Sequence, residues 1–81
     1  MPVVFRHGTF RAFFYSNEGT PREPMHVHVR SGNAEAKVWL EPEVAIADSR
    51  GFNARSLGEI LDLVSMHREE IEEFWHGHFG N

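Results

Sequence analysis

The sequence predicts an α+β fold: a two-layer sandwich with one long C-terminal helix on one face of a mainly antiparallel sheet of four to five strands. Two observations lead to this prediction. Up to about residue 48 the apolar residues form short strand-like runs, whereas from about residue 54 they recur at helical spacing. The chain has only 81 residues, so we expect a single domain over 1–81, with a sheet region over 1–48 and a helix over 53–77.

Each predicted strand is bounded by turn or loop residues. Two apolar, aromatic-rich runs flank the turn signal His7-Gly8 and predict a β-hairpin. Two prolines and a glycine then predict a loop over residues 16–25. The strands are expected over 2–5, 9–15, 25–30, 34–40 and, as a short fifth strand, 43–47.

The helix is predicted by apolar residues spaced three, four and seven positions apart, which places them on one helix face. These residues are Leu57, Ile60, Leu61, Val64, Ile71, Phe74 and Trp75. Asn53 is suited to the N-cap, and Phe52 and Leu57 occupy the two positions of a hydrophobic staple. We expect Gly77 or Gly80 to end the helix.

Composition narrows the class of protein. Cysteine is absent, which excludes disulfides, thiolate metal sites and cysteine nucleophiles. The net charge of −4 is unevenly distributed, because residues 1–40 carry +2 and residues 41–81 carry −6. No apolar stretch approaches the ~20 residues of a membrane span, and the N-terminus does not resemble a signal peptide. We therefore expect a cytoplasmic protein with no membrane partner.

One helix can cover only one face of the sheet, so strand alternation predicts which side chains lie on the uncovered face. That face is expected to be both aromatic and basic. Its predicted residues are Arg11, Phe13, Tyr15, His26, His28, Arg30, Lys37 and Trp39. Such a face favours a homodimer or a small partner protein. Nucleic acid is an alternative ligand, because aromatic rings stack on bases and arginines bind phosphates, but the negative net charge disfavours it.

His26 and His28 stand two positions apart on one predicted strand, so both imidazoles leave the same face. Two such side chains could share a divalent transition metal such as zinc, which needs a third or fourth ligand. His7, Glu18 and Glu23 are candidates for that ligand, and nothing in the sequence selects among them. His67, by contrast, lies on the apolar helix face, and His76 and His78 flank the helix end.

No enzyme motif is visible: the chain has no phosphate-binding glycine loop, no nucleophile elbow and no paired carboxylates. The sequence therefore names no catalytic residue and favours a non-enzymatic protein.

Two longer runs carry a resemblance to a known family. These are the P-x-H-V-H-V run that begins at Pro24 and the A-K-x-W-L-E-P run that begins at Ala36. Together with Gly51-Phe52 and a helix ending near Phe74-Trp75-His76, they resemble the small bacterial family called domain of unknown function 4160. Met25 departs from that family's usual second proline. The resemblance implies a small protein encoded beside another small domain, in settings suggestive of toxin–antitoxin pairs.

The function expected from these observations is a non-enzymatic interaction or regulatory module, antitoxin-like or accessory in a bacterial two-gene pair. The acidic helix and the aromatic, basic sheet face would be its two contact surfaces. A metal-binding protein or small metalloenzyme built on His26 and His28 is the alternative, and nucleic-acid binding through the sheet face is a further one.

Overall fold

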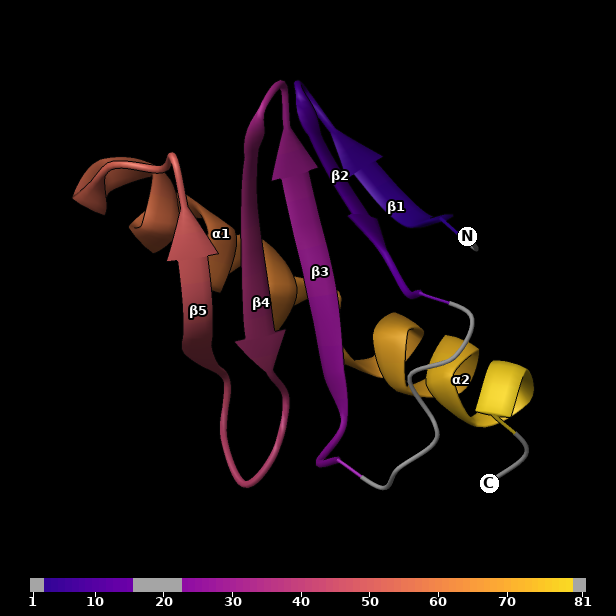
Figure 1. The fold of residues 1–81 in the computed structure, drawn as a ribbon. Coiled ribbons are helices and arrows are strands. Elements are labelled where there is room, and N and C mark those ends of the chain that lie inside the picture. The colour runs from indigo at the N-terminus through magenta and orange to yellow at the C-terminus, as the bar shows by residue number, and fades with distance from the viewer. Residues whose placement is uncertain (1–2, 16–22, 80–81) are drawn as a thin grey trace.

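The computed structural model describes residues 3–15 and 23–79, and two helices lie on one face of a five-stranded sheet (Figure 1). Each strand pairs antiparallel with its neighbour in the chain, so the sheet is a meander of order β1–β2–β3–β4–β5. The predicted α+β class is confirmed. The strands are β1 (Val3–His7), β2 (Phe10–Phe13), β3 (His26–Ser31), β4 (Ala34–Trp39) and β5 (Ala45–Arg50).

The fifth strand lies later in the chain than predicted. The expected segment was 43–47, whereas β5 begins at Ala45 and continues to Arg50. The register of this pairing shifts between Lys37 and Val38, where β5 carries one extra residue, Ala47. Pairing with β4 therefore extends the strand through polar residues that the apolar pattern alone does not mark as strand.

The hairpins β1–β2 and β3–β4 end in tight turns that require glycine. Gly8 and Gly32 have φ angles of 59° and 60°, in the left-handed region that side chains with a Cβ disfavour. The two tips lie side by side at the same end of the sheet (Figure 1). A hydrogen bond joins them, in which the Ser31 hydroxyl donates to Thr9 Oγ1 over 2.8 Å.

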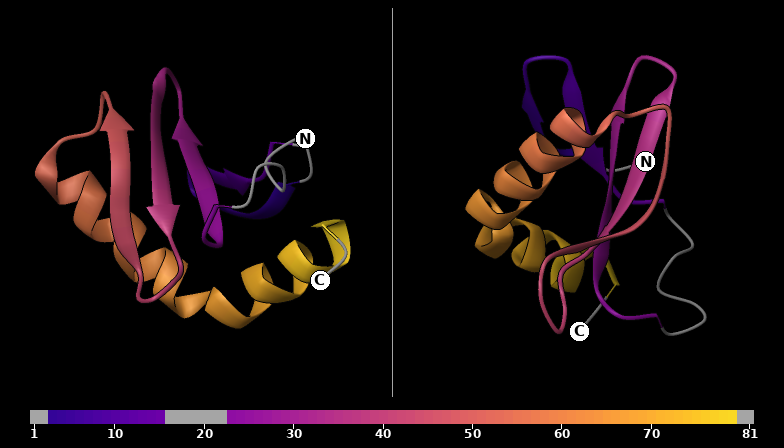
Figure 2. Two further views of the ribbon diagram at one scale, coloured as in Figure 1. Left: turned by 60° about the horizontal axis from the view of Figure 1, so that its bottom comes forward. Right: turned by 90° about the vertical axis from the view of Figure 1, so that its left-hand side faces the viewer.

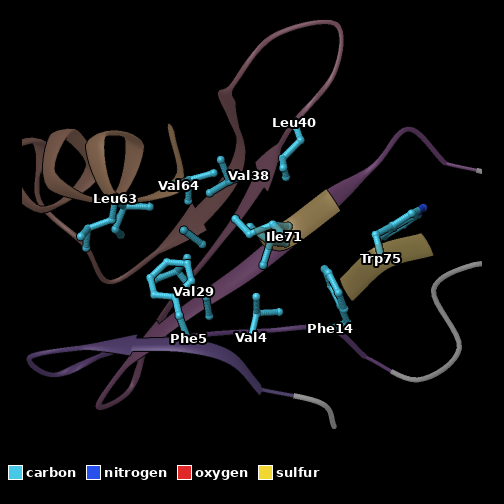
Figure 3. Close-up of a cluster of buried hydrophobic side chains, with 14 of the residues drawn as sticks. Val4, Phe5, Phe14, Val29, Val38, Leu40, Leu63, Val64, Ile71 and Trp75 are labelled. Carbon is cyan, nitrogen blue, oxygen red and sulfur yellow. The ribbon is translucent and has the colours of Figure 1, made fainter. Parts of the chain in front are cut away.

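The apolar core lies between the sheet and the helices (Figure 3). Alternate residues of β3 and β4, among them Val27, Val29 and Val38, are at most 1% exposed on this side. Ala12 and Phe14 join them, so the predicted orientation of the second strand is confirmed. From the helices come Ile60, Leu63, Val64, Ile71 and Trp75. Because each fully buried aliphatic side chain contributes ~1.5–3 kcal/mol, this layer supplies most of the driving force for folding.

The prediction of a single long helix over 53–77 is wrong in one respect, because the structure has two helices. Asn53 is the N-cap of α1 (Ala54–Met66), as expected, and its side chain accepts a hydrogen bond from the Ser56 backbone over 2.8 Å. His67 is the C-cap of α1, and α2 (Arg68–Phe79) follows at once. It continues through Gly77, and Gly80 lies outside the described residues.

The break at His67 bends the helical layer beneath the sheet (Figure 2). A straight helix over both segments would be about 39 Å long at 1.5 Å per residue, whereas the longest dimension of the molecule is 33 Å. Bending keeps α1 near β5 and α2 near β1. The His67 ring stacks on Phe5 with 4.0 Å between ring centroids, and its Nδ1 lies 3.0 Å from Glu70 Oε1.

The break also changes which helix residues face the core. Phe74, predicted to be on the apolar face, is 41% exposed, whereas Ile71 and Trp75 are buried four positions apart. In α1, Leu63 is buried although the predicted face omitted it, and Leu57 and Leu61 are half-buried. Among the described residues, neither helix is long and apolar enough to cross a membrane.

Candidate functional site

The residues predicted for the uncovered sheet face do share one face, on the side opposite to the helices. Phe13 pairs with His28, and His26 pairs with Trp39. Lys37 is the partner of His28 on β4, and Arg11 is the partner of Arg30. Directly paired residues in an antiparallel sheet point to the same side. Register therefore places these paired side chains on one side of the sheet, and their role in binding stays a prediction.

The expectation that this face is open is wrong at its centre. Phe13 and His26 are 0% exposed and His28 is 7% exposed. Their rings pack on one another: 5.7 Å separates the centroids of Phe13 and His28, 5.3 Å those of His26 and His28, and 4.6 Å those of Tyr15 and His28. We call Phe13, Tyr15, His26, His28 and Trp39 the aromatic–histidine cluster. Rings on three neighbouring strand segments bury one another, because edge and face contacts replace contact with water.

Glu35 gives this cluster a polar border. The Tyr15 hydroxyl donates a hydrogen bond to Glu35 Oε2 over 2.8 Å, and His28 Nδ1 lies 3.5 Å from the same oxygen. A small cleft of about 130 Å³ adjoins the pair. Its charged and imidazole side chains are His28, Glu35, Lys37, Asp48 and Arg50. A carboxylate held between a phenol and an imidazole fixes the orientation of both rings.

Lys37 and Trp39 form the other border of the cluster. The Lys37 ammonium lies 4.7 Å from the Trp39 ring centroid, in a cation–π contact, and it forms an ion pair with Glu23. Both side chains are half-buried rather than fully exposed.

His26 links the two layers of the fold. Its ring lies 5.3 Å from the ring of Trp75 on α2 and 5.7 Å from that of Trp39 on β4. Nearby, the backbone N–H of Leu40 donates to the Met25 carbonyl over 2.9 Å, and the Met25 N–H donates to Glu41 Oε1 over 3.0 Å. The two sequence runs that carry the family resemblance are thus bonded to each other.

The histidine pair has one property of metal ligands, but the described residues do not complete a site. The His26 Nδ1–H donates to the Pro24 carbonyl over 3.0 Å, and His28 Nδ1 lies beside Glu35. Oxygen partners of this kind orient the rings of metal-binding histidines. Within residues 3–15 and 23–79, however, no three histidine, aspartate or glutamate side chains are grouped to hold a metal.

The suggested third ligands do not fill this gap. His7 pairs with Phe10, whose side chain packs toward the core, so His7 lies on the helix side of the sheet. Glu23 forms its ion pair with Lys37. Glu18 falls outside the described residues.

Register brings together three arginines that sequence reasoning did not group. Arg6 pairs with Arg11, and Arg11 pairs with Arg30, across three neighbouring strands. We call these three side chains the arginine row. Arg11 and Arg30 were predicted for this face, whereas Arg6 was missed. The alternation of Arg6 with Phe5 in β1 was the only available signal, and a bulge between Val3 and Phe5 obscures it.

The cluster of acidic residues predicted for the helix lies on α2. Glu69, Glu70 and Glu73 are exposed, and they accompany the exposed ring of Phe74. An open groove of about 440 Å³ is lined by Glu73, Phe74, Gly77 and His78. Arg68 pairs with Glu72 over 2.9 Å, so Glu72 is partly neutralised.

One family profile, described as a domain of unknown function (DUF4160), matches residues 9–76. The chain belongs to this family. The match covers both bonded runs, most of the sheet and most of the helical layer. No curated protein and no solved structure matches the chain.

Proposed function

We propose that this DUF4160 protein is a non-enzymatic interaction module, accessory or antitoxin-like in a bacterial two-gene pair, and that α2 docks the partner protein. The observation that carries the proposal is Phe74, a large apolar ring that is 41% exposed beside an open groove. Exposed carboxylates of Glu69, Glu70 and Glu73 lie on the same short helix. An aromatic anchor with charged neighbours is typical of interface hot spots.

The chemistry of α2 defines the partner. The partner should offer an apolar pocket for the Phe74 ring. It should also carry basic side chains around that pocket, because opposite charges steer and orient a complex. The family resemblance supports a second small protein encoded beside this one as the partner.

The test measures binding of the purified product of the adjacent gene. Phe74→Ser should weaken binding at least tenfold, because it removes the apolar anchor. Met66→Ser is the matched control: Met66 is 75% exposed on α1, and its loss should change little. Equal affinities of wild type and Phe74→Ser, or no binding of the adjacent product, would contradict the proposal.

A homodimer through the strand face is the other interaction to be tested, because Trp39 and Lys37 remain partly exposed at the border of the aromatic–histidine cluster. Trp39→Ser should shift sedimentation toward the monomer with an unchanged far-UV spectrum. A wild-type protein that is already monomeric at high concentration would exclude this dimer.

Metal binding by His26 and His28 is a second candidate, favoured by the oxygen partners of both Nδ1 atoms. Zinc titration calorimetry should give an affinity that falls strongly in His26→Ala and His28→Ala but not in His76→Ala, a matched control at the exposed end of α2. Binding should also weaken from about pH 7.5 to about pH 5.5, because metal displaces protons from imidazole. Equal zinc affinity in all four proteins would contradict a site at this pair.

A further inference from the structure

The arginine row lies beside a cleft at the hairpin-tip end of the strand face. The cleft has a volume of about 370 Å³, within the range of small-molecule sites. It is lined by Arg6, Gly8, Thr9, Phe10, Arg11, Arg30 and Gly32. Because neighbouring strands are ~4.8 Å apart, the three guanidinium groups start from closely spaced positions and can converge on one ligand.

The arginine row places three positive charges on neighbouring strands of one face. Within the part of the chain that the structure describes, no carboxylate oxygen lies within ion-pair distance of Arg6, Arg11 or Arg30. Glu35 pairs with Arg30 in the ladder, yet its Oε2 is bonded to the Tyr15 hydroxyl. Like charges directly opposite one another destabilise a sheet. A bound anion would remove this repulsion.

The lining of the cleft matches one class of anion. Guanidinium groups bind phosphate oxygens through two parallel hydrogen bonds, a geometry that a lysine ammonium cannot offer. Thr9 accepts a hydrogen bond from Ser31, so its own hydroxyl proton can be donated to a ligand. Gly8 and Gly32 add no side chain that would block the approach, since the space around each Cβ position is open.

We propose that the arginine row is a binding site for a phosphate group. Arg11 is its centre, flanked by Arg6 and Arg30, and its guanidinium lies 5.7 Å from the Phe13 ring centroid, which helps to orient it. The site is independent of docking at α2. The phosphate can come from a small metabolite or from a nucleic-acid backbone. Base stacking on Phe13 plays no part, because that ring is 0% exposed.

Titration calorimetry with pyrophosphate, and fluorescence anisotropy with a single-stranded oligonucleotide of about twelve nucleotides, test the site and separate the two sources. Pyrophosphate binding identifies a small phosphate ligand, and binding of the oligonucleotide alone identifies a nucleic-acid backbone. Whichever probe binds, Arg11→Gln and Arg30→Gln should each lower its affinity at least tenfold.

Arg55→Gln is the matched control, because it removes one positive charge from an exposed position on α1. It should leave affinity within about twofold of wild type. Far-UV spectra and melting curves establish that each variant is folded. The proposal is overturned if neither probe binds, if Arg55→Gln weakens binding as much as Arg11→Gln, or if a polyglutamate peptide competes as well as pyrophosphate.

Discussion

The two faces of the sheet are built from the same five strands but differ in what their side chains contact. Toward the helices, Val27, Val29 and Val38 lie in a continuous apolar layer sealed by Ile60 and Ile71. The opposite face changes character along its length, from the buried aromatic–histidine cluster to the arginine row at the hairpin tips. The first face is explained by folding alone. The charge of the second face is not explained by folding, and the proposed phosphate site would account for it.

The largest expected effect tests the helix-facing layer. Ile71→Ala should lower the free energy of unfolding by about 2–5 kcal/mol, because Ile71 is 0% exposed and its truncation leaves a cavity. Urea denaturation measures this change. Met66→Ala, on the exposed side of α1, should cost less than about 0.5 kcal/mol. Similar urea midpoints for the two variants would mean that the helices do not seal the core as described.

An intermediate effect is expected at the border of the aromatic–histidine cluster. Tyr15→Phe should cost about 1–2 kcal/mol, because it removes a hydrogen bond to the partly buried carboxylate of Glu35. A double-mutant cycle with Glu35→Gln isolates the coupling between the two groups. Additive effects of the two substitutions would show that this hydrogen bond does not stabilise the strand face.

The smallest effect, of opposite sign, concerns the arginine row. Without ligand and at low salt, Arg11→Gln should raise the free energy of unfolding by about 0.2–1 kcal/mol, because it relieves repulsion from Arg6 and Arg30. The gain should shrink as salt screens the charges. Thermal melts at several salt concentrations measure it, with Arg55→Gln as the neutral reference. Destabilisation by Arg11→Gln at every salt concentration would mean that the row is not under electrostatic strain.

The contrast between the faces also explains how much the sequence could predict. Gly8, the alternation in β3 and the N-cap Asn53 are local signals, so the first hairpin, the central strands and the start of α1 were predicted correctly. No proline or glycine marks the break at His67, and the stacking of its ring on Phe5 joins residues far apart in the sequence.

Strand alternation predicts which side chains share the strand face, but not how they pack against one another. Alternation assigned Phe13, His26 and His28 to one face, but their burial depends on rings from other strands. The arginine row depends on the register of three strands and on the bulge near Val4, neither of which leaves a local pattern.

The meander has a consequence for how this chain folds as it is synthesised. Every strand pairs with the one before it, so all four ladders can close over short stretches of chain, a topology that favours rapid folding. The helices come last, however, and until residues 54–79 leave the ribosome the apolar side of the completed sheet has no cover. A nascent chain halted before α1 would expose an apolar, valine-rich surface that is prone to aggregation, of the kind that chaperones shield.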